Sequence, residues 1–214
     1  MKTEQLILSP PGIEGTLDLP ARAKGIVVFA HGSGSSRLSP RNRAVARGLH
    51  AFGFGTLLFD LLTEAEAEDR RNVFDIDLLA ERLMLATRAL RAHHVERGTP
   101  VGYFGASTGA AAALKAAALP RAEVAAIVSR GGRPDLAAAA LPDVTSPTLL
   151  IVGSLDYDVL ELNRQALALL RCERRLAIVD GATHLFEEPG AMDEVVALAG
   201  SWFRAHLAGN AGPG

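Results

Sequence analysis

Short apolar runs alternate along this chain with longer segments of helical periodicity, and this alternation limits the possible folds more than any other feature. Buried strands separated by helices form parallel sheets that helices cover on both faces. We predict strands at 5–8, 16–19, 25–30, 56–59, 101–104, 125–129, 148–152 and 175–179. We predict helices at 40–52, 74–94, 108–119, 162–170 and 192–207. The expected fold is α/β, with a doubly wound, mostly parallel sheet of about eight strands.

The length of 214 residues suits a single domain. We expect residues 1–208 to form that domain and the glycine-rich stretch 209–214 to be a flexible tail. The first two strands are joined through Pro-Pro-Gly at 10–12, which suits an antiparallel hairpin at a sheet edge. The stretch 61–71 has mixed charge, and we expect a solvated loop there rather than a flap over a pocket. No insertion is long enough to form a large helical cap domain.

The composition excludes several classes of function. A formal net charge of −2 argues against binding to nucleic acid or to an anionic membrane surface. No apolar run approaches the roughly 18 residues that a membrane span needs, and the first residues lack the apolar region of a secretory signal. Cys172 is the only cysteine, so neither an internal disulfide nor a cysteine-based metal cluster can form. We therefore expect a cytoplasmic protein, monomeric or homodimeric.

Residues 105–109 read Gly-Ala-Ser-Thr-Gly and lie between a predicted buried strand and a predicted helix. This is the context of a G-x-S-x-G nucleophile elbow, in which a serine stands on a sharp turn above the strand ends. Glycine on each side of the serine gives that turn the room it needs. The start of the following helix favours the negative charge that develops in acyl transfer. The pattern predicts Ser107 as a nucleophile.

A candidate acid and a candidate base follow later strands of the predicted sheet. Asp156 lies after the strand at 148–152, and His184 lies after the last strand. A serine hydroxyl needs an imidazole to remove its proton, and the imidazole needs a carboxylate to fix its tautomer. Asp158 is the alternative acid. The chain order of nucleophile, acid and base is that of α/β-hydrolases.

The loop after the first buried strand, residues 29–36, is the expected source of a second oxyanion contact. We predict that the backbone N–H groups of Ser33 and Thr108 form the oxyanion hole, with Gly34 as the alternative to Ser33. His31 lies in the same loop. We expect it to shape the loop, because His184 already supplies the base.

Four arginines lie in or beside loops at the carboxyl edge of the predicted sheet: Arg37, Arg41, Arg130 and Arg133. The planar guanidinium recognises carboxylate or phosphate through a fork of donors. One or two of them are therefore candidates to bind an anionic group of the substrate. The alternative is that they form surface ion pairs or hold loop backbones.

These motifs together resemble those of the dienelactone hydrolase family of α/β-hydrolases over most of the chain, about residues 25–207. Residues 153–159 look like the family's G-x-x-D-x-x-V acid loop, which favours Asp156 over Asp158, and 181–186 look like its G-x-x-H-x-F base loop. A closer resemblance is to a dienelactone hydrolase-like subgroup sometimes fused to phosphoribosyltransferases, through segments 31–37, 39–42 and 129–135.

One departure from the family concerns the nucleophile. Dienelactone hydrolases carry cysteine there, whereas this chain has Ser107, and Cys172 lies outside the elbow. The sequence therefore predicts a serine hydrolase that cleaves a small carboxylic ester, thioester or lactone through an acyl-enzyme, without a metal or organic cofactor. The alternatives are an acyltransferase with the same residues, or a non-catalytic binding module that retains the fold.

Overall fold

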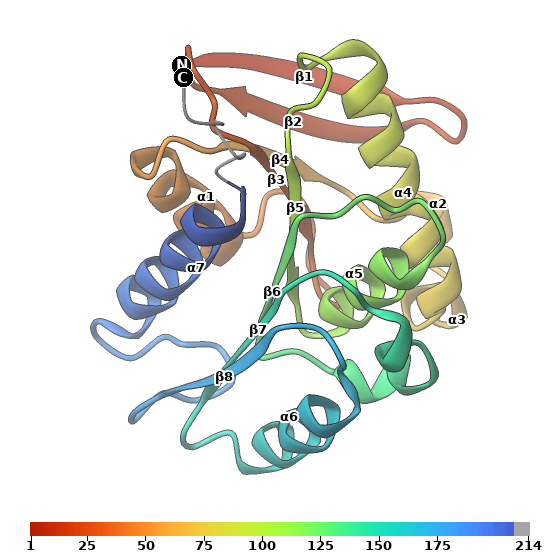
Figure 1. Ribbon diagram of the computed structural model, residues 1–214. Helices are drawn as coiled ribbons and strands as arrows, with labels where there is room; N and C mark the ends of the chain where they lie inside the picture. The colour runs from red at the N-terminus through yellow and green to blue at the C-terminus, as the bar shows by residue number, and fades with distance from the viewer. Residues whose placement is uncertain (208–214) are drawn as a thin grey trace.

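The computed structural model describes residues 1–207 and contains an eight-stranded sheet with helices on both faces (Figure 1). The strands are β1 (Lys2–Leu8), β2 (Ile13–Leu19), β3 (Ile26–Ala30), β4 (Gly55–Phe59), β5 (Val101–Ala106), β6 (Ala126–Arg130), β7 (Thr148–Gly153) and β8 (Arg174–Val179). The helices are α1 (Pro40–Ala51), α2 (Glu64–Ala67), α3 (Arg70–Val73), α4 (Ile76–His93), α5 (Thr108–Ala118), the 3-10 helix η1 (Pro134–Asp143), α6 (Tyr157–Leu169) and α7 (Ala191–Leu207). The predicted tail at 209–214 lies outside the described residues.

The strand order is β1-β2-β4-β3-β5-β6-β7-β8. The strands from β3 to β8 run parallel, whereas β1 and β2 pair antiparallel with each other and β2 pairs antiparallel with β4. The predicted α/β architecture of about eight mostly parallel strands is therefore confirmed. Since parallel strands bring their carboxyl ends to one edge, the loops after β3, β5, β6, β7 and β8 converge there.

Two apolar layers enclose the sheet. Helices α1 and α7 pack together on one face, and α4, α5, α6 and η1 cover the other (Figure 1). The central strands β3, β4, β5 and β7 are buried along their whole length, which explains their continuous apolar sequences. The alanine-rich α5 is mostly buried, because small side chains let a helix lie close to a sheet.

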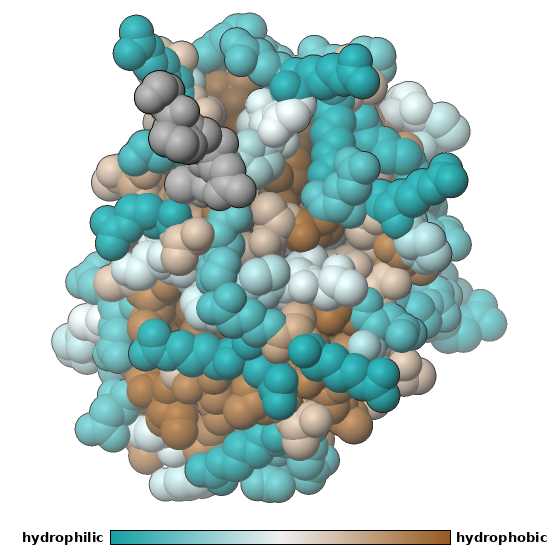
Figure 2. Space-filling view, viewed as in Figure 1, coloured by the Kyte–Doolittle hydropathy of each residue, from teal (hydrophilic) through white to brown (hydrophobic). Residues whose placement is uncertain are grey.

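Polar and apolar side chains are unevenly distributed on the face of the molecule drawn in Figure 2. In the same view as Figure 1, Figure 2 shows polar side chains over much of the molecule and apolar ones between them in the lower half, around β7, β8 and α6. None of the helices in the described part of the chain is both long enough and apolar enough to cross a membrane.

The structure corrects the sequence-based expectation for one connecting segment. The stretch 61–71, predicted to be a solvated loop, contains α2 and the start of α3 and lines a pocket. Thr63 caps α2 through a reciprocal capping box with Glu66, a signal that lies within the sequence. Helix α6 begins at Tyr157, five positions before the predicted start at 162, and its first turn already buries Val159 and Leu160.

Candidate active site

Ser107 stands alone between a strand and a helix. Strand β5 ends at Ala106 and α5 begins at Thr108, so Ser107 occupies the turn between them with φ 52° and ψ −123°. Few non-glycine residues adopt a positive φ, and such residues cluster at functional sites. A methyl group on Gly105 would lie 2.4 Å from Cα of Ala110, and one on Gly109 would lie 2.2 Å from the carbonyl oxygen of Ala30. Gly105 therefore lets α5 fold back against the end of β5, and Gly109 lets α5 lie directly against the end of β3.

The loops after β7 and β8 bring an aspartate and a histidine together. Nδ1 of His184 lies 2.6 Å from Oδ2 of Asp156. Asp156 is the N-cap residue of α6 but makes no side-chain capping bond, so its carboxylate is available to the imidazole. Asp158, the alternative acid, is exposed in the first turn of α6. The geometry thus pairs His184 with Asp156.

The loop at residues 130–133 adjoins both Ser107 and His184. The Ser107 amide donates to the Arg130 carbonyl oxygen at 3.3 Å, and the Arg133 amide donates to the Ser107 carbonyl oxygen at 3.0 Å. A methyl group on Gly131, which has φ 50°, would lie 3.5 Å from two atoms of the His184 ring. Within residues 1–207 no hydrogen bond joins the side chains of Ser107 and His184. Contacts between a nucleophile and its base often tighten only when substrate binds.

The two residues whose amides are predicted to form the oxyanion hole are joined by a hydrogen bond to a side chain. The Ser33 N–H donates to the Thr108 hydroxyl oxygen at 2.9 Å, so this amide is already engaged. Gly32 lies directly against the serine, since a methyl group there would be 2.9 Å from Cβ of Ser107. The loop after β3 and the start of α5 therefore meet beside Ser107. Gly34 has φ 68°, which favours glycine at that position.

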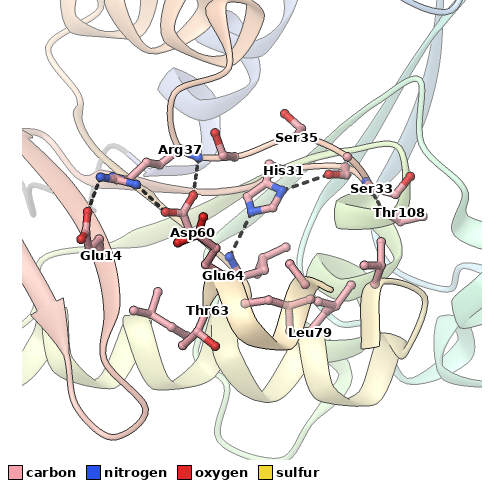
Figure 3. Close-up of a pocket in the computed structure, with 18 of the residues that line it drawn as sticks. Glu14, His31, Ser33, Ser35, Arg37, Asp60, Thr63, Glu64, Leu79 and Thr108 are labelled. Atoms are coloured by element: carbon pink, nitrogen blue, oxygen red, sulfur yellow. Dashed lines mark hydrogen bonds and ion pairs between the residues drawn. The ribbon is translucent and has the colours of Figure 1, made fainter. Parts of the chain in front are cut away.

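His31 is tied into the backbone on both sides of its ring (Figure 3). The Leu61 amide donates to its Nε2 at 3.0 Å, and its Nδ1 lies 3.0 Å from the Gly32 carbonyl oxygen. A nitrogen that accepts carries no proton, so Nδ1 carries the hydrogen and donates to Gly32. Burial lowers the pKa of His31, which keeps the ring neutral. These contacts agree with the expected loop-shaping role.

Three of the four arginines predicted near the site have acidic partners. Arg37 donates to Asp60 at 2.6 Å and also pairs with Glu14. Arg41 pairs with Glu187 at 3.0 Å. Arg133 makes two bonds to Asp135, at 2.9 and 2.8 Å. These three arginines therefore form the ion pairs that the sequence analysis gave as the alternative to binding a substrate anion.

Arg130 differs from the other three arginines. It is only 8% exposed, and its Nε and Nη1 atoms have no hydrogen-bond partner. Its guanidinium lies 5.7 Å from the centre of the Phe186 ring, two residues after His184. Burial, assisted by the nearby charge of Arg41, lowers the pKa of Arg130 to about 10, so the group remains a cation at neutral pH. It is a buried cation at the edge of the site.

A pocket with a volume of about 650 Å³ lies beside the loop after β3. Sequence reasoning missed it, because its walls come from β2, from the loops after β3 and β4, from α2, α3 and α4, and from the start of α5. The partial signals were the capping box at Thr63 and the leucines at 61 and 62. Among residues 1–207, no group of three or more His, Cys, Asp or Glu side chains is placed to hold a metal ion.

Comparison with known proteins finds solved structures that resemble this chain over almost its whole length. A dienelactone hydrolase from Anabaena variabilis has 50% sequence identity and a TM-score of 0.91, covering 97% of this chain and 100% of that one. The esterase Est1E from Butyrivibrio proteoclasticus has a TM-score of 0.80 at 14% identity, covering 97% of this chain and 100% of its own, and shares the fold. No family model matches the chain.

Curated relatives come from Mycobacterium tuberculosis. The proteins named "Putative phosphoribosyl transferase Rv0571c" and "Putative phosphoribosyl transferase MT0597" are each 57% identical over 205 residues. The match covers 96% of this chain and 46% of each relative. The chain therefore spans about half the length of these proteins.

Proposed function

Because the chain belongs to the dienelactone hydrolase family of α/β-hydrolases, we propose that it is a serine hydrolase that cleaves a small carboxylic ester. The observation that carries the proposal is the 2.6 Å contact between His184 and Asp156, beside a serine held at φ 52°. Rarely populated backbone conformations cluster at functional sites, and a base that a carboxylate orients is what activates a serine nucleophile.

The proposed reaction starts with proton transfer from Ser107 to His184. Because Nδ1 faces the Asp156 carboxylate, Nδ1 carries a hydrogen and Nε2 is left as the base. The serine oxygen attacks the acyl carbon, and the imidazolium returns its proton to the leaving alcohol. Water, deprotonated by the same imidazole, then attacks the acyl-enzyme and releases the acid, and Ser107 regains its proton.

The oxyanion of each tetrahedral intermediate is assigned to backbone amides. The Thr108 N–H at the start of α5 is one donor, where the helix terminus favours negative charge. The Ser33 N–H is the second. Because Ser33 donates to the Thr108 hydroxyl in the resting protein, the oxyanion has to replace or share that acceptor.

Arg130 is assigned to an anionic group of the substrate. Burying a cation without a hydrogen-bonded partner is costly, and two guanidinium nitrogens of Arg130 have none. The Arg130 backbone carbonyl accepts from the Ser107 amide, and in the sheet Arg130 pairs with Ala106, the residue before Ser107. The other three arginines are neutralised by their own carboxylates, which makes them poorer candidates.

The test is hydrolysis of a panel of short esters, thioesters and lactones by the wild type and by single-residue variants. Ser107→Ala and His184→Asn should each lose about 10³-fold or more in kcat. Asp156→Asn should also lose most of the activity, while Asp158→Asn, at the exposed neighbouring carboxylate, should not. Undiminished hydrolysis by Ser107→Ala would exclude the mechanism, and activity on no member of the panel would favour a non-catalytic module.

A further inference from the structure

The pocket beside the loop after β3 has two chemically different ends (Figure 3). At one end, Arg37 forms its ion pairs with Asp60 and Glu14. At the other end, Ser33 is hydrogen-bonded to Thr108. We refer to this space, lined in part by Ala67 of α2, as the α2 pocket. Its volume of about 650 Å³ lies in the range of sites that enclose small ligands.

The α2 pocket reaches the proposed nucleophile. Thr108, which follows Ser107, lines it, and so does Gly32, which lies against the Ser107 side chain. A group attached to a carbonyl carbon at Ser107 can therefore extend past the Ser33–Thr108 end and into the pocket. Arg130 belongs to β6, on the other side of β5 from β3 and β4. An anionic group at Arg130 and a group in the pocket would thus lie on opposite sides of the nucleophile.

The lining of the α2 pocket favours a neutral hydrocarbon group. Buried apolar side chains come from Ile13, Leu61 and Leu79, and Val73 and Ala67 extend this wall. The ionisable groups in the lining are the His31 imidazole, the Arg37 guanidinium and the carboxylates of Glu14, Asp60 and Glu64. Arg37 pairs with two of the carboxylates, so the net charge of the lining is negative. Carboxylates repel an anionic group, whereas apolar walls stabilise a hydrocarbon chain by removing it from water.

The wall formed by α2 is fixed in place. Oε1 of Glu66 accepts from the Arg82 guanidinium of α4 at 2.6 Å, and Oε2 of Glu66 accepts from the Thr63 amide at 2.9 Å. Both interactions are partly buried. A pocket with anchored walls discriminates by the size of what enters it.

We propose that the α2 pocket binds a neutral hydrocarbon chain of the substrate, so that the protein selects esters in which one half is a short to medium alkyl group. This inference rests on the proposed ester hydrolysis and adds a substrate class to it. Residues of α2 then determine specificity, although sequence reasoning assigned this helix to a solvated loop.

The first test is a pair of ester series measured by kcat/KM. One series lengthens the acyl chain from acetate to butanoate and hexanoate with a constant alcohol, and the other lengthens the alcohol with constant acetate. We expect kcat/KM to rise about two- to fourfold per methylene in one series, until the pocket is filled. A flat response in both series would overturn the proposal.

Two matched variants of α2 locate the effect. Ala67 lines the pocket, whereas Ala65, also exposed and on the same short helix, does not. In the series that responds to chain length, we compare kcat/KM for the ester with the six-carbon chain with kcat/KM for the shortest ester. In Ala67→Phe this ratio should fall at least tenfold. In Ala65→Phe the ratio should stay within about twofold of the wild-type value. Equal ratios in the two variants would contradict the assignment.

A binding measurement separates failure of this inference from failure of the proposed catalysis. The ligand 1-hexanol is neutral and cannot be hydrolysed, so its binding does not depend on Ser107. In an NMR titration we expect Ala67→Phe to weaken 1-hexanol binding at least fivefold relative to Ala65→Phe. Equal affinity in the two variants overturns the pocket assignment whatever the ester assays show. A difference in affinity without ester hydrolysis overturns the catalytic proposal and retains the hydrocarbon site.

Discussion

The amide of Ser33 donates a hydrogen bond to the hydroxyl of Thr108 over 2.9 Å, although the two residues are 75 positions apart in the chain. The bond joins the loop after β3 to the start of α5 at the side of Ser107. It also engages an amide that the proposed mechanism needs for the oxyanion. In the resting protein the Ser33 amide is therefore bonded to the uncharged hydroxyl of Thr108 and not to an oxyanion.

Removal of the Thr108 hydroxyl tests whether that contact competes with the oxyanion. Thr108→Val leaves the Ser33 amide without its resting acceptor, so capture of the oxyanion no longer breaks a hydrogen bond. A net hydrogen bond contributes about 0.5–1.5 kcal/mol, so we expect kcat/KM for a short ester to rise about 2- to 10-fold. Thr108→Ser retains a hydroxyl and should show a smaller rise. A fall of tenfold or more in Thr108→Val would show instead that the hydroxyl positions the amide for catalysis.

Replacement of Arg130 tests its assignment to an anionic group. Arg130→Gln removes the charge that is buried against Phe186. Hydrogen bonds to charged groups contribute about 1.5–3 kcal/mol, so KM for an ester with a terminal carboxylate should rise about 10- to 100-fold. KM for the neutral ester of equal length should change much less. The matched control is Arg133→Gln, because Arg133 already pairs with Asp135. An equal rise in KM for the anionic and the neutral ester in Arg130→Gln would contradict an anion-binding role for Arg130.

His31 makes the stability of the loop after β3 dependent on pH. Its folded pKa is lowered by burial, so below about pH 6.5 the unfolded chain binds a proton that the folded chain does not. This contribution to stability is complete above that pH and is lost as the pH falls toward the folded pKa. His31→Leu should cost about 1–3 kcal/mol in the free energy of unfolding at neutral pH, because the Leu61 amide loses its acceptor.

Urea unfolding curves for the wild type and His31→Leu, recorded at several pH values, check this expectation. The difference in unfolding free energy between the two proteins should shrink by up to about 1.4 kcal/mol per pH unit below pH 6.5. A difference that stays constant from neutral to acid pH would mean that His31 takes up a proton as readily in the folded state as in the unfolded state.

The features predictable from sequence are those that depend on neighbours along the chain. Strand β5, the turn at Ser107 and helix α5 are continuous in sequence, and apolar periodicity and paired glycines indicate them directly. The starts and ends of most strands differ from the prediction by three residues or fewer, because apolar runs mark strand cores better than strand ends.

The features that sequence reasoning missed depend on contacts between distant segments. Arg37 and Asp60 are 23 residues apart, and only the pairing of β3 with β4 brings their loops together. The same holds for the α2 pocket, whose walls come from separate elements. The unpartnered state of Arg130 follows from its place at the end of the buried strand β6, and a count of arginines could not distinguish it from Arg37, Arg41 and Arg133.

The central claim is that Ser107 is a nucleophile activated by His184. The most direct measurement is labelling with a fluorophosphonate probe, followed by mass spectrometry of the digested protein. We predict one adduct, on the peptide that contains Ser107, with labelling slowed at least 100-fold in His184→Asn. The absence of an adduct on Ser107 in protein that hydrolyses esters, or equally fast labelling in His184→Asn, would contradict the account.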